Sequence, residues 1–433
     1  MEALAEDIMD KRSNRLVVLF IYLSVFINSY VFSKEPFEFH FGYIIFLVLL
    51  PAFMTRHKLS KNLVYCFSLL LAIGLLNIVL GNNTASQFFK VFTGMTLSYF
   101  FYYYVIVEFE MNVDRLFKWY LKGAYIVSII GAIQFISYQI GFKPGYNYKW
   151  IFNKWGVISG GNFGIRINSI FGEPSHLGGV LSAAFFVALY NLFQKEGYYL
   201  SRKQSILIVV IYLLSFSGLG QMGIFLSIVF LAVSFGLVRY ILLLVPMMMF
   251  LFYLLYNNVK DFKDRYDSLI ELFTTGKFIL GKTHGSSFIL YNNYTVALKN
   301  FQTNFVFGTG IGSHLIAFEK YSLAKDWAVR GFNFNSADAN SMLLRLISET
   351  GLFGVTVFLV IIIKGYVKRT ENALTNHWLI SNALLIMILL NLFRQGHYFL
   401  NGFPFFLMLY IFNAVDYKNK MKQDELITDV SKA

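Results

Sequence analysis

Long apolar runs alternate with short polar segments along almost the whole chain. Most runs approach the length of about 20 residues that a helix needs to cross a bilayer. They fall at residues 16–33, 41–54, 63–81, 88–108, 119–141, 174–193, 205–217, 220–238, 240–256, 341–363, 378–393 and 403–415. This pattern predicts an all-α polytopic membrane protein with about 12 transmembrane helices, in which residues 1–433 form a single membrane domain.

One part of this pattern can be divided in two ways. Residues 205–238 are apolar apart from the interruption SGLGQMG at 217–223. A single helix over this stretch would be about 51 Å long, much longer than the bilayer core is thick. We therefore predict two helices, with a break at the interruption.

The basic residues orient the predicted spans. With a cytoplasmic N-terminus, 20 of the 37 Lys and Arg residues fall in cytoplasmic segments, as the positive-inside rule requires. Joining 205–238 into one helix would move the last seven of these 20 to the outside. Twelve spans therefore place both termini inside and two long loops outside, at 142–173 and 257–340. We expect the larger loop to be partly helical and to form a cap.

The composition agrees with a membrane protein, because 57% of the residues are apolar and only 14% are charged, against about 25% charged residues in soluble domains. The net charge of +13 is explained first by topology, so we expect no nucleic-acid partner. The outer loops still carry more basic than acidic residues, which indicates an anionic partner outside the membrane. The single cysteine, Cys66, excludes an intrachain disulfide and a cysteine-based metal cage.

The segment RINSIFGEPSHLGG, residues 166–179, crowds polar groups at the start of an apolar run. Proline is favoured at the first helical position, so Glu173, just before Pro174, is predicted at the positive end of a helix dipole. Arg166 lies at the outer interface, where a guanidinium can bind phosphate oxygens. The alternatives are structural: a helix-terminal Glu173, an interfacial His176, and an Arg166 that snorkels.

The segment FGTGIGSH, residues 307–314, contains three glycines at alternate positions. Its spacing differs from the dinucleotide-binding fingerprint, and no strand–helix unit surrounds it. The predicted topology also places it outside the cytoplasm, where nucleotide donors are not available. We therefore reject a nucleotide site and favour a tight turn, with a backbone that approaches a ligand beside His314 as the alternative.

The segment FNSADANSMLLRLISETGLFG, residues 334–354, places polar and charged groups in a predicted span. Asp338 and Asn340 precede the apolar helix, and Arg345 and Glu349 lie four residues apart on one of its faces. Intramembrane charges usually face a partner or a cavity. The alternative is a buried Arg345–Glu349 pair that only locks the helices together.

A fourth polar group ends another predicted span on the same side of the membrane. Arg394 and His397 lie in LFRQGHYF, residues 392–399. The topology thus brings all these polar segments to the outer face, and this coincidence is more specific than any single motif.

These segments together resemble the bacterial O-antigen polymerase (Wzy) and O-antigen ligase superfamily. The resemblance rests on RINSIFGEPS at 166–175, the glycine-rich stretch in the large outer loop, and NSMLLRLISETGLFG at 340–354. The superfamily's ligases place a histidine just before the asparagine of the last motif, where this chain has Ala339. This departure favours the polymerase.

The resemblance implies glycan transfer at the outer leaflet from a polyprenyl diphosphate, so we expect a glycosyltransferase without a cofactor. We also expect it to be metal-independent, because no cluster in the sequence has the ligand count for a metal site. Arg166 would hold the diphosphate, helped by Arg330 and Arg345. Relatives also carry an arginine before the glycine-rich turn. SFILYNNYTVALKNF at 287–301 has none, so Lys282, Arg265 or Arg330 must replace it.

The remaining assignments concern the acceptor, the partners and the location. The candidates for general base are, in order, Glu173, Asp338 and His176, and the further substrate contacts are His314, Asn340 and Arg394. The expected partners are undecaprenyl-diphosphate-linked oligosaccharide and membrane lipid, with a chain-length regulator protein as a candidate. The expected location is the bacterial inner membrane, with the active site facing the periplasm.

Two other functions remain open. A ligase of the same superfamily would move finished glycan to another acceptor, and Ala339 argues against it. A transporter or flippase for lipid-linked oligosaccharide would carry polar groups near the bilayer midplane and show internal repeats. No repeat is visible, and the interruption at 217–223 is the one feature that favours transport.

Overall fold

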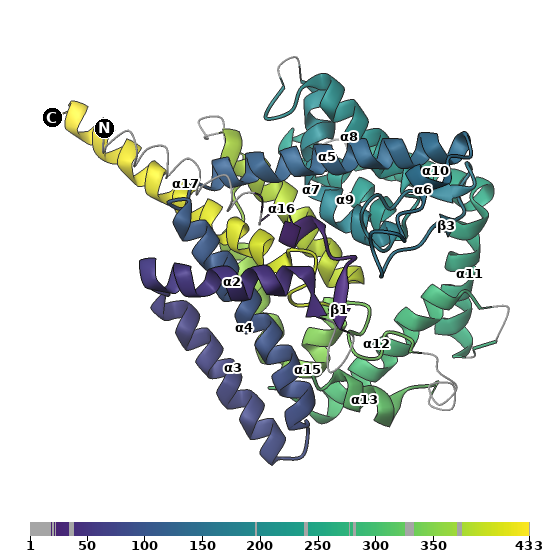
Figure 1. Ribbon diagram of the computed structural model, residues 1–433, viewed down its shortest axis with the longest axis horizontal. Coiled ribbons are helices and arrows are strands. Elements are labelled where there is room, and N and C mark those ends of the chain that lie inside the picture. The colour runs from purple at the N-terminus through teal and green to yellow at the C-terminus, as the bar shows by residue number, and fades with distance from the viewer. Residues whose placement is uncertain are drawn as a thin grey trace.

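A computed structural model describes most of the chain, at residues 19, 21, 23–33, 39–194, 197–237, 241–276, 278–279, 283–324, 333–369 and 375–432. Helices dominate it (Figure 1). They are α2 Phe41–Arg56, α3 Lys61–Val79, α4 Ala85–Glu108, α5 Val113–Gln139, α6 Lys143–Tyr146, α7 Pro174–Phe193, α8 Arg202–Leu214, α9 Gly218–Ser234, α10 Ile241–Asn258, α11 Lys260–Thr275, α12 Gly285–Thr303, α13 His314–Tyr321, α15 Met342–Gly365, α16 Thr375–Arg394 and α17 Phe403–Lys432.

Two small antiparallel hairpins interrupt the helices. Strand β1 (Val31–Ser33) pairs with β2 (Phe39–His40), and β3 (Ile158–Ser159) pairs with β4 (Ile165–Arg166). In the second hairpin Ile158 lies opposite Arg166. Both hairpins lie in connections between helices. The fold is therefore helical, and its described strands are only two or three residues long.

Five helices in the described part of the chain are long and apolar enough to cross a membrane: α3, α5, α7, α15 and α16. Helices α2 and α9 are apolar but shorter. The protein is therefore an α-helical membrane protein, as the apolar runs predict. The described helices also follow the predicted runs from 41–54 onward, and residues 23–26 of the first run are helical.

The apolar stretch at 205–238 forms two helices, so that prediction is confirmed. Helix α8 ends at Leu214 and α9 begins at Gly218. Between them Phe216 has φ 44°, a left-handed conformation that ends a helix. The Ser217 hydroxyl then accepts a hydrogen bond from the Gly220 N–H at 2.8 Å and caps α9.

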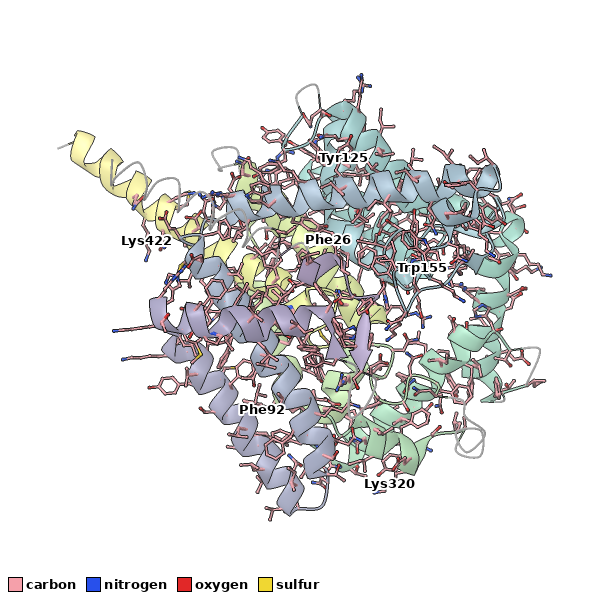
Figure 2. The ribbon with its side chains drawn as sticks, in the orientation of Figure 1. Phe26, Phe92, Tyr125, Trp155, Lys320 and Lys422 are labelled. Atoms are coloured by element: carbon pink, nitrogen blue, oxygen red, sulfur yellow. The ribbon has the colours of Figure 1, made fainter. Side chains whose placement is uncertain are left out.

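Helices α7 and α16 lie at the centre of the bundle, and each packs against α9 and against the other. Small residues allow this close approach, since a Cβ at Gly178 would lie 2.7 Å from the Ser217 hydroxyl. The Tyr120 hydroxyl of α5 donates to the Val180 carbonyl at 2.6 Å and fixes α7 from a third side. Figure 2 shows Phe26 in the interior of this bundle and Lys422 on the projecting end of α17.

Helices α11, α12 and α13 lie in the predicted larger outer loop and form the side of the molecule away from the projecting end of α17 (Figure 1). The described residues within 257–340 are thus partly helical.

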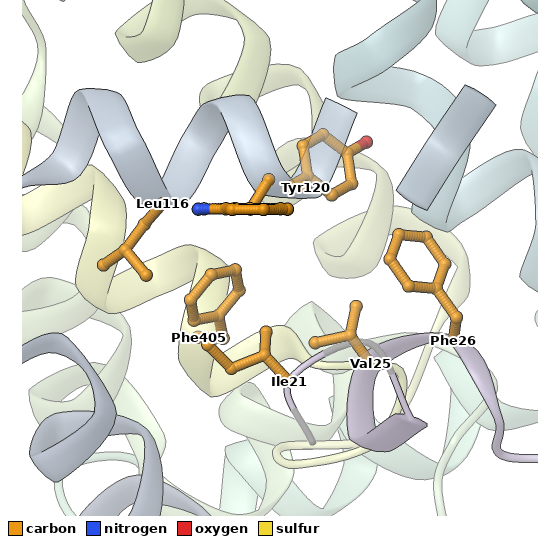
Figure 3. A pocket seen from close by; sticks show the side chains of 7 residues that line it. Ile21, Val25, Phe26, Leu116, Tyr120 and Phe405 are labelled. Carbon is orange, nitrogen blue, oxygen red and sulfur yellow. The ribbon is translucent and has the colours of Figure 1, made fainter. Parts of the chain in front are cut away.

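A small apolar void lies inside the bundle (Figure 3). It measures about 10 Å³, and its lining residues are Ile21, Val25, Phe26, Leu116, Trp119, Tyr120 and Phe405. A space of this size holds about one water molecule, and its walls are almost entirely apolar. It is a packing defect and provides no site for a substrate.

Candidate functional site

A polar pocket of about 420 Å³ lies where the ends of several helices meet. Its walls come from the start of α2, the start of α4, the start of α7, the turn before α15, and the connection from α16 to α17. Its charged and titratable side chains are Lys90, Lys154, Arg345, Arg394, Glu173, Asp338, His40, His176 and His397. A pocket with this many ionisable groups in a membrane protein is a candidate for function.

The pocket gathers most of the candidates that sequence reasoning named. The six that line it are Glu173, His176, Asp338, Asn340, Arg345 and Arg394. Arg166 and His314 do not line it, and Arg330 and Lys282 lie outside the described residues. The three separate segments at 166–179, 334–354 and 392–399 therefore do converge.

The α7 end of the pocket carries Glu173 with its carboxylate exposed. Pro174 is the first helical residue, as predicted, and Glu173 is the N-cap with an extended backbone. The Glu173 side chain makes no capping hydrogen bond and instead accepts one from the Ser175 hydroxyl at 3.0 Å. Its negative charge lies at the positive end of α7 and remains available to the pocket.

Asp338 and His397 contact each other in the pocket wall. The His397 Nε2 lies 2.8 Å from the Asp338 Oδ2, and the Asp338 Oδ1 accepts a hydrogen bond from the Asn340 N–H at 2.9 Å. A Cβ at Gly396 would lie 1.5 Å from the Asp338 carbonyl oxygen, so only glycine allows the two segments to approach this closely.

The environment of Asp338 keeps its carboxyl group ionised. Burial by itself raises the pKa of Asp338, but the charge and hydrogen bond of His397, with the Asn340 amide, hold that pKa below its usual range. A carboxylate at Nε2 favours the histidine tautomer that has its proton on Nε2. The Nδ1 of His397 then carries a lone pair, and the His397 side chain is one-third exposed.

Arg345 and Glu349 form a buried pair behind the pocket. The Arg345 Nε donates to the Glu349 Oε1 at 2.9 Å, and its Nη1 donates to the Gly396 carbonyl at 3.0 Å. The Tyr398 hydroxyl donates to the other carboxylate oxygen, Glu349 Oε2, at 2.9 Å. Arg345 thus reaches the pocket with its charge balanced by Glu349, and it ties α15 to the α16–α17 connection.

The glycine-rich segment, residues 307–314, packs against α15 next to the Arg345–Glu349 pair. Helix α15 is kinked at Gly351, which has φ 59° and ψ −157°. The turn fits into the kink, because the Gly310 N–H donates to the Glu349 carbonyl at 2.8 Å and the Leu352 N–H donates to the Phe305 carbonyl at 2.9 Å. This geometry is that of a tight turn, the interpretation favoured from the sequence.

His314 is buried beside this turn and not in the pocket. Its Nε2 lies 3.1 Å from the Asn293 Oδ1, and its backbone N–H donates to the Glu349 Oε1 at 3.3 Å. Burial, followed by the charge of Arg345, lowers the pKa of His314 to about 3. A neutral imidazole in this position connects α13 to α12.

Arg166 lies on the second hairpin, away from the pocket lining. Its side chain packs over Gly160, where an added Cβ would lie 3.3 Å from the Arg166 Cδ. The cations that line the pocket are instead Lys90, Lys154, Arg345 and Arg394. Arg394 is tied to α12 by a hydrogen bond from its Nη1 to the Ser286 carbonyl at 3.3 Å.

Sequence reasoning missed Lys90 and the pairing role of His397. Lys90 is an isolated basic residue near the start of a predicted apolar run. The predicted topology gives no reason to assign it a function. Lys154 was visible only as part of a basic outer loop. Their meeting depends on how α4, the segment 142–173 and α16 pack, which no local pattern shows.

Known proteins add no assignment to this geometry. No protein-family model matches the chain, and no curated protein matches it significantly. The described residues contain no group of three or more His, Cys, Asp or Glu side chains that could hold a metal ion.

Proposed function

We propose that this protein is a polysaccharide repeat-unit polymerase of the bacterial inner membrane. It would transfer a growing glycan from undecaprenyl diphosphate to a hydroxyl group of the next lipid-linked repeat unit, at the periplasmic face. One observation carries the proposal: a single pocket combines cations suited to a diphosphate with a carboxylate–imidazole pair suited to a hydroxyl group.

The cationic groups have a defined role in this reaction. The bond from the anomeric carbon to the diphosphate oxygen breaks, and the leaving diphosphate gains negative charge. Fixed cations at that point stabilise the transition state. We assign this role to Arg394 and Lys90, which line the pocket. Arg345 also lines it, but its charge is balanced by Glu349, and Arg166 does not line the pocket.

The Asp338–His397 pair supplies a base. The acceptor hydroxyl gives its proton to the His397 Nδ1 while its oxygen forms the new bond to the anomeric carbon, and the electron pair of the broken bond leaves with the diphosphate. Asp338 orients the ring and stabilises the imidazolium that forms. Glu173 is the competing base, since its carboxylate also faces the pocket.

The same arrangement favours a transferase over a transporter. The lining groups lie at the beginning of α7 and α15 and at the end of α16. A transporter would place them near the middle of the spans. The O-antigen ligase alternative shares the chemistry of this pocket and differs in the acceptor.

Complementation of a deletion strain tests the proposal. Arg394→Gln is expected to reduce the surface-glycan ladder to a single repeat unit at equal protein level, because it removes a lining cation. Arg166→Gln is the matched control and is expected to keep the ladder. If Arg166→Gln loses the ladder and Arg394→Gln keeps it, the diphosphate-binding role belongs to Arg166 and not to Arg394. A deletion that leaves single repeat units trapped inside the cell would indicate a flippase, and one that leaves polymer unattached would indicate a ligase.

A further inference from the structure

The helices of the outer cap carry a row of apolar side chains that are at least 39% exposed. We call this row the apolar belt and define it as Tyr266, Ile270, Phe273, Tyr294, Leu298, Phe305, Val306 and Phe307. Phe305, Val306 and Phe307 are 50%, 53% and 54% exposed. Three consecutive apolar residues on a turn would be unfavourable in water, and exposed apolar patches mark interaction surfaces.

Contacts join the belt into one surface. Phe273 of α11 meets Tyr294 of α12 with ring centroids 5.7 Å apart. Leu298 follows Tyr294 by one helical turn and lies on the same face. Phe301 then meets Phe305 at 4.7 Å, so the belt continues from α11 along α12 to the turn.

The belt is continuous with the outer surface of α15. Phe307 meets Phe353 at 5.6 Å, and the Phe353 N–H donates to the Val306 carbonyl at 2.9 Å. Helix α15 is long and apolar enough to cross the membrane, and Phe353, Val357 and Ile363 are exposed along it. Exposed apolar side chains on a spanning helix face lipid, so the turn bonded to α15 lies at the depth where that lipid-facing surface begins.

Charged residues flank the belt in the way expected at a membrane surface. On α11, Tyr266, Ile270 and Phe273 share one face, while Asp264 and Glu271 lie on the opposite side and are exposed. A helix with this division is typical of those that lie in the interface.

Two lysines lie on the helices that carry the end of the belt. Lys299 follows Leu298 directly on α12, and Lys320 of α13 lies over the Tyr321 ring at 5.0 Å. Figure 2 shows Lys320 at the edge of the molecule. Aromatic residues and lysines together are characteristic of the headgroup level.

We infer that the outer cap rests on the outer leaflet of the membrane, with the apolar belt against the acyl chains and with Lys299 and Lys320 at the headgroups. The occupant of this surface is therefore bilayer lipid. The inference follows from continuity with α15 and does not depend on the proposed function.

Spin labels on single cysteines test the inference in nanodiscs. Cys66→Ser removes the one native cysteine, and labels are placed at Ile270→Cys and Phe307→Cys. Val357→Cys, within the α15 span, is the reference for lipid, and Asp264→Cys is the matched control on the polar side of α11. We expect the labels at positions 270 and 307 to collide with oxygen more than with a water-soluble nickel chelate, as at position 357, and the label at 264 to show the reverse.

Two results would overturn the inference. If the labels at 270 and 307 behave like the label at 264, the belt lies in water. If they are immobilised and reached by neither reagent, a second copy of the chain or another protein covers the belt. A measurement on the unmodified protein guards against variants that do not fold: a lipid-soluble photoactivated carbene should label peptides within 294–307 as well as α15, and labelling of α15 alone would contradict the inference.

Discussion

At the scale of single residues, the pocket separates its ionisable groups by what each one contacts. Glu349 accepts hydrogen bonds from Arg345, Tyr398 and the His314 backbone and is completely buried. His397 is bound on one nitrogen by Asp338 and faces the pocket. A group whose hydrogen-bonding atoms all have partners within the protein stabilises the structure. A group with a hydrogen-bonding atom that faces a cavity can act on a substrate.

The proposed base can be tested against its competitor. His397→Gln removes the basic nitrogen, and we expect the polymerisation rate to fall by roughly 10² to 10⁴-fold, the usual contribution of general acid–base catalysis. Glu173→Gln should have a smaller effect on the rate. The measurement is the elongation of lipid-linked repeat units by purified enzyme in nanodiscs. A larger loss with Glu173→Gln than with His397→Gln would assign the base to Glu173.

His314 should make the stability of the protein depend on pH. Its pKa of about 3 in the folded state lies below the unfolded value of about 6.5. Between these values the unfolded chain binds more protons, so stability falls as the pH falls. We expect a loss of about 2 kcal/mol at pH 5 relative to pH 7.

Unfolding in detergent at pH 7 and pH 5 measures this effect. His314→Gln keeps a polar side chain but removes the titrating group, so the difference between the two pH values should shrink in this variant. Equal pH dependence in the wild type and the variant would show that other groups are responsible.

At the scale of elements, the kink in α15 and the glycine-rich turn form one interlocked unit. Gly351 interrupts the helix, and the backbone of residues 305–310 supplies hydrogen bonds to the α15 backbone at the kink. This arrangement holds the first part of α15, with Arg345 and Glu349, beneath the pocket. The turn therefore serves the site indirectly, by fixing the direction of that helical segment.

Gly351→Ala is expected to destabilise the protein by about 1–3 kcal/mol, because the backbone conformation at this position is almost restricted to glycine. An added Cβ would also lie 2.6 Å from the Phe305 carbonyl oxygen. The measurement is thermal unfolding in detergent. Gly285→Ala is the control, since no atom lies within 4 Å of its added Cβ, and equal melting temperatures for the two variants would refute the interlock.

At the scale of the whole molecule, the orientation of the helices decides which side of the membrane the pocket faces. The charge pattern predicts that α17 beyond its apolar part is cytoplasmic and that the segments 142–173 and 257–340 are periplasmic. The pocket lies at the ends of α7 and α16 that are predicted to be outside. A lipid-linked donor would then reach it from the outer leaflet.

Labelling of intact cells tests this topology. In a Cys66→Ser background, Lys149→Cys and Glu319→Cys should react with a membrane-impermeant maleimide, because both positions are exposed and predicted outside. Lys58→Cys and Lys420→Cys, also exposed, should react only after the cells are opened. Reaction at position 420 in intact cells would require an odd number of spans.

The sequence by itself determined that this is a helical membrane protein, because burial of apolar residues in a bilayer requires long apolar runs that are visible without any structure. It also located the boundary between α8 and α9 at a serine–glycine interruption, and the helix start at Pro174. These features depend on neighbouring residues, and local patterns record them.

Only the tertiary structure decided which polar residues meet. Arg394 and Lys154 are separated by more than half of the chain yet line one pocket, whereas Arg166, seven residues before Glu173, does not reach it. The contact between Asp338 and His397 depends on the crossing of two segments at Gly396. Such meetings follow from helix packing over long sequence distances, where no periodicity in the sequence specifies the partner.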